Sequence, residues 1–395
     1  MIQDAEDKIS QLAIESVHKG KTAFCKFLSA NDTGLTGGHQ CGIYIPKHSS
    51  ALIFDQAGVK GENKERTAKI RWQGTSETES NFKYYGQGTR NEYRITKFGR
   101  GFDLLRPVNT GALAVIVKMD IEDYEGWVLE KEDDIDEFLE YFALTPADTN
   151  KLIEVQQPEE KVIDHMDSFI HMLKGKFPKA YDMSAAARKI YTDVYDHIEN
   201  IVKKPDNQLL EWNNMEYSLF QRIEELQYGD IIRKGFSNMQ DFIDTANSVL
   251  NRRKSRAGKS LEYHLEALFD GNDLCYESQV VTEVKKRPDF VFPCGRAYHD
   301  SSYPSDKLTV LAAKTTCKDR WRQVINEADR VKTKYLCTLQ QGISQNQLHE
   351  MKEENVVLVV PQPFINTYPA EYREDIYSIS KFIAMVKEKN ATYGN

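Results

Sequence analysis

The chain has 395 residues, of which 28% are charged and 40% hydrophobic, and its formal net charge is −8 at pH 7. This length allows two or three domains that each bury a core, and the composition is ordinary for a soluble globular protein. No stretch approaches the roughly 18 apolar residues of a membrane span, the N-terminus lacks a secretory pattern, and the six cysteines form no CxxC pair. We therefore expect a cytoplasmic protein with reduced thiols and no membrane contact.

Charge is distributed unevenly along the first part of the chain. Residues 19–106 hold 15 Lys and Arg against 8 Asp and Glu, whereas residues 120–140 hold 11 acids and 1 base. A basic region followed by an acidic strip suits a domain that binds a polyanion beside a segment that does not. Two unrelated solvated surfaces would give the same pattern.

Residues 1–18 show helical periodicity. Two short strands are expected before residue 47, and several more between residues 67 and 119. Short strands separated by glycine turns predict a small all-β barrel or sandwich. The loop at residues 29–40 is rich in glycine and small polar residues, but it lacks the P-loop pattern and no helix clearly follows it. The expected strands are residues 24–28, 41–46, 68–72, 81–86, 92–98 and 112–117.

The loops of this β region carry side chains that are suited to reading DNA. Arg can form two hydrogen bonds with guanine, Asn can do the same with adenine, and Glu can accept a hydrogen bond from cytosine. A polar rim on a barrel is the structural alternative. The side chains concerned are Arg90, Asn91, Glu92, Arg94, Lys97 and Arg100.

Residues 120–160 read as the end of the barrel followed by a linker. The acidic run at 132–137 favours a solvated face over a metal site, and Pro146 and Pro158 indicate a domain boundary. Amphipathic helices are expected from residue 162 to residue 250, with apolar stripes that face a core or, alternatively, a dimer interface. The resulting division is a first domain at 1–145, a linker at 146–164 and a second domain at 165–395.

Three residues of the second domain suggest a metal-dependent phosphodiesterase site. Asp289 precedes a buried apolar run and Lys314 ends another, so two adjacent strands would place them side by side. Glu262 belongs to a preceding amphipathic helix. Two carboxylates can hold Mg²⁺, which lowers the pKa of a bound water, and a nearby Lys can orient that water and offset charge on the phosphate. Helices interleaved with strands predict an α/β fold here.

Four runs in this region resemble the catalytic domain of the EcoRII-type restriction endonucleases. They are RRKSRAGKSLE at 252–262, the PDF that contains Asp289, AYHD at 297–300 and KTTCKDRWRQ at 314–323. In this branch of the PD-(D/E)xK nucleases, the acid that usually lies two residues before the Lys is replaced by a Glu further along the chain. The usual position is Ala312 here. The resemblance implies three Mg²⁺-binding carboxylates and one Lys as the catalytic set: Glu262, Asp289, Lys314 and Glu327.

Short runs of the first domain, among them LSANDTG, TGGHQ, TRNE and NTGAL, resemble the effector domain of the same family. The resemblance implies an N-terminal all-β pseudo-barrel that grips duplex DNA with two arms. It covers most of residues 22–117 and is interrupted between residues 47 and 80. The residues it places on the first arm are Lys26, Ser29, Asn31 and Asp32, and those on the second arm are Arg90, Asn91, Glu92, Arg94 and Lys97.

Further DNA contacts are expected around the catalytic residues. The basic run at 251–259 suits phosphate contacts, although a solvated helix end would look the same. The segment after Lys314 reads C and G bases in the family, and an Arg there suits guanine best. The expected DNA contacts are Arg256, Lys259, Lys318, Asp319 and Arg320.

Tyr298 could act as a covalent nucleophile, but metal-assisted hydrolysis already accounts for the acidic cluster, so a structural role is favoured.

Together these features predict a type II restriction endonuclease of a prokaryotic cytoplasm that hydrolyses duplex DNA with Mg²⁺. The resemblance implies a short CC-GG-type palindrome, interrupted by A or T in near relatives, and an effector domain that restrains the nuclease until it binds a second copy of the site. A palindromic target calls for a homodimer. A DNA-binding regulator with a degenerate nuclease fold and a structure-specific repair nuclease are the alternatives, and the presence of all four catalytic side chains counts against degeneration.

Overall fold

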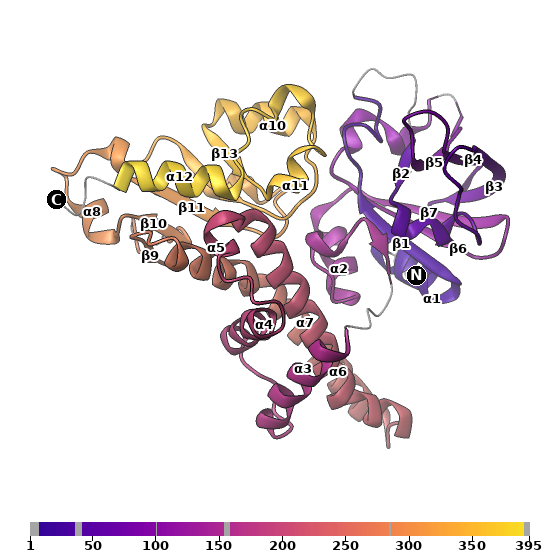
Figure 1. Cartoon of the computed structure of the whole chain (residues 1–395), viewed down its shortest axis with the longest axis horizontal. Coiled ribbons are helices and arrows are strands. Elements are labelled where there is room, and N and C mark those ends of the chain that lie inside the picture. The colour runs from indigo at the N-terminus through magenta and orange to yellow at the C-terminus, as the bar shows by residue number, and fades with distance from the viewer. Residues whose placement is uncertain (1–7, 36–41, 100, 154–158, 284–285, 391–395) are drawn as a thin grey trace, which may run out of the picture. The chain divides into compact units, whose positions relative to one another are not determined.

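The structure is a computed structural model that describes residues 8–35, 42–99, 101–153, 159–283 and 286–390 (Figure 1). The chain divides into two compact units. The N-terminal unit extends to residue 154 and includes the segments Gln340–His349 and Asn366–Arg373, and the remaining residues form the C-terminal unit. None of the described helices has the length and apolar content that crossing a membrane requires.

An eight-stranded sheet is the framework of the N-terminal unit. The strand order is β2-β5-β4-β3-β7-β6-β1-β8, and the pairings are antiparallel except that of β3 with β7. The strands are β1 (Thr22–Phe27), β2 (Ile43–Ile45), β3 (Lys64–Trp72), β4 (Ser76–Tyr85), β5 (Glu92–Thr96), β6 (Leu113–Lys118), β7 (Asp123–Leu129) and β8 (Lys151–Leu152).

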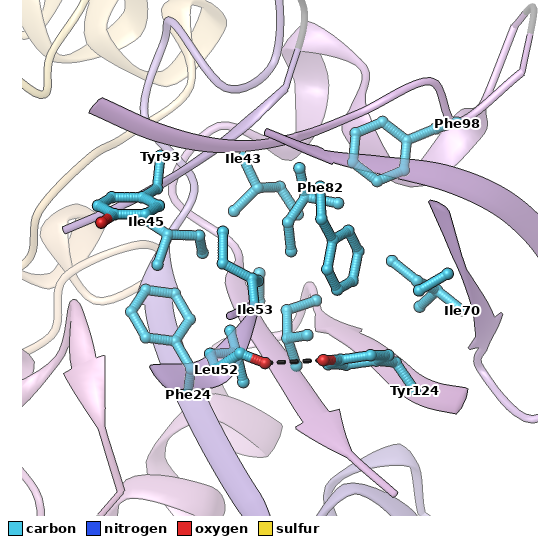
Figure 2. Packing of buried hydrophobic residues seen from close by; sticks show 14 of the residues in the cluster. Phe24, Ile43, Ile45, Leu52, Ile53, Ile70, Phe82, Tyr93, Phe98 and Tyr124 are labelled. Carbon is cyan, nitrogen blue, oxygen red and sulfur yellow. Dashed lines mark hydrogen bonds between the residues drawn. The ribbon is translucent and has the colours of Figure 1, made fainter. Parts of the chain in front are cut away.

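This sheet curls around an apolar core (Figure 2). In β3 and β4 the residues alternate between buried and more exposed positions over most of each strand, as expected when one face of a sheet lies in a core. Phe24 of β1 and Ile43 of β2 lie towards opposite ends of the strand order, yet both belong to the same buried cluster as Phe82 of β4. Tyr124 also lies in the cluster, and its hydroxyl donates a buried hydrogen bond to the carbonyl oxygen of Leu52 at 2.8 Å. The predicted strand-rich, barrel-like N-terminal fold is confirmed.

Two helices of this unit pack against each other, α1 (Ile9–Lys19) and α2 (Glu132–Tyr141). The Ser10 hydroxyl donates to Glu137 at 3.0 Å, and the His18 ring lies 2.8 Å from the Tyr141 hydroxyl oxygen. The acidic run expected as a solvated face supplies the first turn of α2, where carboxylates interact favourably with the helix dipole. Part of that run is therefore structural, and Glu132 is buried.

The sheet continues beyond the strands that were predicted from the sequence. β7 lies within the acidic strip, and β8 lies within the segment that was expected to be a linker. β8 pairs with β1, so that Leu152 lies opposite Phe24. A two-residue strand has almost no sequence pattern of its own, because its partner strand supplies the hydrogen bonds that define it.

Long helices precede the sheet of the C-terminal unit. α6 and α7 contain 30 and 33 residues, and the second half of α7 buries Leu261, Leu265, Leu268 and Phe269. This half of α7 also carries Glu262. The helices before the sheet are α3 (Glu160–Leu173), α4 (Ala180–Tyr195), α5 (Asn200–Lys203), α6 (Pro205–Lys234) and α7 (Met239–Gly271).

The sheet of the C-terminal unit has the order β13-β12-β11-β10-β9. β11, β12 and β13 run parallel, whereas β10 is antiparallel to both β9 and β11. The strands are β9 (Glu277–Ser278), β10 (Phe290–Phe292), β11 (Thr309–Ala313), β12 (Lys334–Cys337) and β13 (Val356–Val359), and the helices between and after them are α8 (Gly295–His299), α9 (Trp321–Ile325), α10 (Gln345–Glu353), α11 (Gln362–Ile365) and α12 (Ile379–Asn390).

Side chains of β10 are buried on both faces of this sheet. The Phe292 ring packs against Phe269 of α7 and Phe382 of α12, with ring centroids 5.3 and 5.7 Å away. Val291 instead belongs to a cluster that includes Tyr298 of α8. Burial on both faces explains why this short strand reads as a continuous apolar run. The predicted α/β region is confirmed.

Candidate active site

The pairing of β10 with β11 brings Asp289 and Lys314 together. Phe290 lies opposite Leu311, so Asp289 is level with the end of β11. One oxygen of the buried Asp289 carboxylate accepts hydrogen bonds from the backbone N–H of Ala313 at 2.8 Å and from Lys314 Nζ at 3.0 Å. The structure therefore places Asp289 and Lys314 side by side, as the two apolar runs predicted.

Glu262 reaches the same place from α7. Lys259 Nζ lies 2.9 and 2.7 Å from the two oxygens of its carboxylate. Burial raises the pKa of the Glu262 carboxyl, Lys259 acts against that rise and Asp289 adds to it, which shows that the two acids interact electrostatically.

A glutamine that the sequence did not single out joins the two carboxylates. Gln279 Nε2 donates to Glu262 Oε2 at 3.1 Å and to Asp289 Oδ1 at 3.0 Å. Its backbone N–H donates to the carbonyl of Asp289 at 3.1 Å, and its φ of 56° lies in the left-handed region. Gln279 directly follows β9, which pairs with β10. Its position depends on this pairing, and no local sequence pattern signals it.

Glu327 lies within electrostatic reach of these groups. It follows α9 directly in the chain. The segment from Lys314 to Arg320, which precedes α9, is not helical. Burial raises the pKa of its carboxyl from the ordinary value of 4.5 to about 7, Lys314 lowers it in part, and Asp289 raises it further. Within the described residues, no three His, Cys, Asp or Glu side chains converge closely enough to hold a metal ion. Glu327 is therefore near the Asp289–Lys314 pair without sharing a ligand set with Glu262 and Asp289.

Of the DNA contacts expected in the basic run, Arg256 has a structural position. Only 5% of this residue is exposed, and its Nε lies 3.6 Å from Glu216 Oε1. Its guanidinium also lies over the rings of Tyr217 and Phe220 at 5.2 and 5.4 Å. Arg256 is buried within the helical layer, so its guanidinium is not exposed to a DNA backbone. A charged side chain on an amphipathic helix can face inward when an acid lies opposite it, as Glu216 does here.

The other expected contacts of this unit vary in exposure. Lys259 is exposed but pairs with Glu262. In the segment between Lys314 and α9, Lys318 is buried, Arg320 is half-buried and Asp319 is exposed. Asp319 and Arg320 thus remain candidates for base contacts near the Asp289–Lys314 pair.

Tyr298 belongs to the apolar core rather than to the acidic cluster. Only 2% of the residue is exposed, its hydroxyl donates to Glu283, and it accepts a hydrogen bond from the backbone N–H of Arg330 at 3.3 Å. Burial and the Glu283 contact raise the pKa of the Tyr298 phenol, which opposes formation of a phenolate nucleophile. The geometry favours the structural role.

In the N-terminal unit, three of the arm residues form an internal network. Lys26 Nζ lies 2.7 Å from Asp32 Oδ2, and both side chains are buried. Asp32 also accepts hydrogen bonds from the backbone N–H and hydroxyl of Ser29 and from the backbone N–H of Tyr44. A fully buried Asp32 holds the loop in shape and presents no group to DNA, whereas the neighbouring Asn31 is exposed.

The two predicted arms meet at β2. Tyr44 of β2 bonds to Asp32 from the first arm and lies opposite Arg94 of β5 from the second. Arg94 is 8% exposed, with its Nε 3.4 Å from Glu92 Oε1. The remaining residues of the second arm, Arg90, Asn91 and Lys97, are exposed. Residues 36–41 and Arg100 lie outside the described residues.

Both units match known protein families. The family model described as "Restriction endonuclease EcoRII, N-terminal" matches residues 17–149, and that described as "EcoRII C terminal" matches residues 220–383. The chain is 38% identical to the type II restriction enzyme EcoRII of Escherichia coli in an alignment over 381 residues that covers 91% of this chain and 93% of that relative. It is 31% identical to the type II restriction enzyme SsoII of Shigella sonnei in an alignment over 150 residues that covers 35% of this chain and 48% of that relative.

A solved structure titled "Metal-depleted Ecl18kI in complex with uncleaved, modified DNA" is also similar to this chain. The superposition covers 59% of this chain and 86% of the chain in that structure, with a TM-score of 0.48 and 21% sequence identity.

The sequence matches define a type II restriction endonuclease with a separate N-terminal effector domain. The identity to EcoRII extends over nearly the whole chain, and the two family models include Glu262, Asp289, Lys314 and Glu327 on one side and the arm residues on the other. The chain therefore belongs to the EcoRII family. The family and the kind of enzyme that were predicted from the sequence are confirmed.

The raised pKa of Glu327 has a measurable consequence for stability. A carboxyl that binds its proton more tightly in the folded state makes stability fall as pH rises, here between about 4.5 and 7. We expect Glu327→Gln, which has no proton to lose, to be more stable than the wild type at pH 8 by about 1–3 kcal/mol, and this difference to vanish towards pH 4.5. Urea unfolding at several pH values measures it. Glu388→Gln, an exposed change on α12, should show no such pH dependence, and a pH-independent difference for Glu327→Gln would contradict the assignment.

Proposed function

We propose that this endonuclease hydrolyses both strands of duplex DNA with Mg²⁺ at the site formed by Glu262, Asp289, Lys314 and Glu327. The observation that carries the proposal is the Asp289–Lys314 pair at the end of two adjacent strands, linked to Glu262 through Gln279. Cleavage would leave 5′-phosphate and 3′-hydroxyl ends.

The donor chemistry of this site suits Mg²⁺. Carboxylate oxygens are the ligands that this ion prefers, and it is commonly held by only one or two carboxylates together with water and substrate phosphate oxygens. Glu262 and Asp289 supply two such groups. The Glu327 carboxyl interacts electrostatically with Asp289 but does not converge with the other two carboxylates in the structure, so it would have to approach them to supply a third. When bound, Mg²⁺ polarises the phosphodiester and lowers the pKa of a bound water.

The remaining chemistry comes from the chain itself. The Lys314 ammonium lies 3.0 Å from Asp289, so it is held at the edge where a phosphate would approach the carboxylates. A fixed positive charge at that point offsets the negative charge that develops on the phosphate oxygens, and the ammonium can orient the attacking water. The backbone N–H of Ala313 holds the same Asp289 oxygen, which fixes the direction of the carboxylate.

The relatives support the biological setting. Both are named type II restriction enzymes. We infer a short CC-GG-type palindrome as the target, a homodimer that treats the two strands alike, and an N-terminal effector unit that restrains the nuclease until a second copy of the site is bound. We place the enzyme in a prokaryotic cytoplasm.

Digestion of a plasmid with Mg²⁺, followed by sequencing of the ends, tests this proposal. Discrete fragments with one common end sequence support site-specific cleavage. Cutting confined to branched or mismatched DNA would favour a structure-specific repair nuclease instead, and absence of cutting would favour a regulator.

Lys314→Ala removes the cation beside Asp289. We expect it to slow cleavage by about 10²–10⁴-fold while DNA binding is retained, because the ammonium acts on charge that appears during the reaction. Plasmid cleavage rates and a gel-shift titration measure the two effects. Lys352→Ala removes an exposed ion pair with Asp375 elsewhere in the same unit and serves as the matched control. Undiminished cleavage by Lys314→Ala would exclude this site.

Gln279→Ala removes the two N–H donors that join Glu262 to Asp289. Groups that orient metal-binding side chains typically contribute about 10–100-fold to metal affinity, so we expect the Mg²⁺ concentration for half-maximal cleavage to rise by that factor. Calorimetric titration of Mg²⁺ without DNA should show the same weakening. Gln362→Ala, at an exposed position of the same unit, should change neither quantity. Equal metal affinity in Gln279→Ala would mean that the amide does not organise the carboxylates.

Arg90→Ala tests the second arm of the effector unit. Arg90 is exposed in the turn between β4 and β5, with its guanidinium 5.3 Å from the Tyr85 ring. An Arg that contacts a base contributes about 1–3 kcal/mol, so we expect affinity of the full chain for a DNA carrying the cleavage site to fall about 10–100-fold. Arg71→Ala, an exposed position on β3, is the control. Fluorescence anisotropy that shows equal affinity for both variants and the wild type would remove Arg90 from the interface.

A further inference from the structure

A pocket of about 340 Å³ lies at one end of the curled sheet of the N-terminal unit, where β3 begins and β6 ends. β7 lies between these two strands, parallel to β3 and antiparallel to β6, so the start of β3 and the end of β6 meet at the same end. A pocket of this volume at the mouth of a barrel is typical of a small-molecule site. We call it the basic pocket, and six of the eight residues that line it are Phe54, Asp55, Lys64, Arg66, Lys118 and Ile121.

The three cations of the basic pocket occupy inward-facing positions of the sheet. Side chains alternate between the two faces of a strand, so Lys64 and Arg66 lie on the face of β3 that buries Ala68 in the core. Lys118 follows Ile116 in the same way on the inner face of β6. All three cations are half-buried. Charged side chains at positions that face a core are uncommon, so three of them at one end of this core indicate a function.

Arg66 maintains the shape of the pocket. Its guanidinium donates to the carbonyls of Ile53 at 2.7 Å and Ile121 at 2.8 Å, and to the Tyr124 hydroxyl at 2.5 Å. It also lies over the Phe82 ring, 4.7 Å from the centroid. Because these contacts come from segments far apart in the chain, Arg66 fixes the walls of the pocket relative to one another.

Lys64 and Lys118 make fewer contacts and point the remaining charge at the pocket. Lys64 Nζ donates to the carbonyl of Gln56 at 2.9 Å, and Lys118 Nζ donates to Asp55 Oδ1 at 2.8 Å. An ammonium group has three N–H donors, so each lysine keeps donors that the described part of the chain does not use. These donors are available to an acceptor that enters the pocket.

The charges of the pocket favour an anion. Asp55 is the one acid among the eight lining residues, and its side chain is 75% exposed. Its hydrogen bond with Lys118 lowers the pKa of its carboxyl, and Arg66 and Lys64 lower this pKa further. The three cations therefore act together on one negative group at the pocket.

A phosphate monoester matches this charge better than a phosphodiester does. Three cations and one carboxylate leave a charge of +2, and a phosphate monoester carries about −1.5 to −2 at pH 7, whereas each phosphodiester of DNA carries about −1. Asp120, which also interacts with Lys118, is paired with Lys21 at 2.6 Å. The pocket has room for more than a phosphate group, and Ile121, which is 63% exposed, offers an apolar wall for the rest of a ligand.

We infer that the basic pocket binds a phosphate monoester on an organic group of about the size of a nucleoside. Lys64 and Lys118 hold the phosphate, Arg66 keeps the walls in place, and Ile121 contacts the organic group. None of these residues belongs to the two arms or to the proposed nuclease site, so binding requires neither Mg²⁺ nor cleavage. A free nucleotide and the 5′-phosphate end of a DNA strand both offer this chemistry.

Calorimetric titration of the full chain with thymidine 5′-monophosphate, without Mg²⁺, tests the inference. Thymidine, which lacks the phosphate, should bind at least about 10-fold more weakly, because charge-assisted hydrogen bonds to the phosphate provide most of the affinity. Equal affinity for the two compounds, or no binding of the nucleotide, would overturn the inference.

The double variant Lys64→Gln with Lys118→Gln locates the bound nucleotide. It removes two charges and keeps polar side chains, so we expect affinity for the nucleotide to fall at least about 10-fold. The matched control is Lys69→Gln with Lys83→Gln, which removes two charges from outward-facing positions of β3 and β4. If the double variant binds the nucleotide as tightly as this control, the basic pocket is not the site.

Asp55→Asn provides a test with the opposite sign, which a loss of folding cannot imitate. It removes the acid that competes for Lys118, so we expect the nucleotide to bind about 2–5-fold more tightly. The Asp55 side chain is exposed, so this change leaves the packing of the sheet intact. Unchanged or weaker binding would contradict the role given to the cations.

Two short duplexes without the cleavage site, one with 5′-phosphate and one with 5′-hydroxyl ends, distinguish the two sources of the phosphate. Tighter binding of the phosphorylated duplex that is lost in the Lys64→Gln and Lys118→Gln variant identifies a DNA end as the ligand. Equal binding of both duplexes, together with binding of the mononucleotide in the pocket, identifies a free nucleotide.

Discussion

The two hydrogen bonds to one oxygen of Asp289 determine the geometry of the proposed nuclease site. One comes from the backbone of β11 and the other from Lys314, so the pairing of β10 with β11 fixes an acid and a base together. β10 is held in turn by aromatic packing against α7 and α12. Because α7 also carries Glu262, the same packing that stabilises the sheet positions the second carboxylate. The packing of the core therefore also sets the geometry of the site.

Charged side chains of this protein have two different roles, and burial separates them. Asp32 and Arg256 are buried, and each is matched by an opposite charge and by surrounding packing, so they maintain shape. Arg90, in the turn between β4 and β5, and Lys97, just after β5, are exposed, and we propose that they contact DNA. An unpaired buried charge is very costly, so every inward-facing ion requires a counterion nearby. The network around Asp32 holds the loop that presents Asn31.

The placement of Asp289 beside Lys314 in the proposed site could be predicted because both residues are tied to strong local patterns. Asp289 and Lys314 flank apolar strands, and strand adjacency alone brings them together. Gln279 could not be found in this way, since it lies beside a two-residue strand and its role arises from tertiary pairing. The burial of Arg256 could not be predicted for a related reason: sequence shows that Arg256 is charged, but only the fold shows that Glu216 faces it. β8 was missed because β1 defines it.

The pairing of β8 with β1 also bears on how this protein can be divided in the laboratory. Lys151 and Leu152 occupy the edge of the sheet beside Cys25 and Phe24, on strands more than a hundred positions apart in the chain. An effector fragment that stops at residue 145 would leave the hydrogen-bonding groups of β1 bare, and a bare strand edge is a template for aggregation. Expression boundaries for this half of the enzyme belong after residue 153, where the last bond to Ala23 has been made.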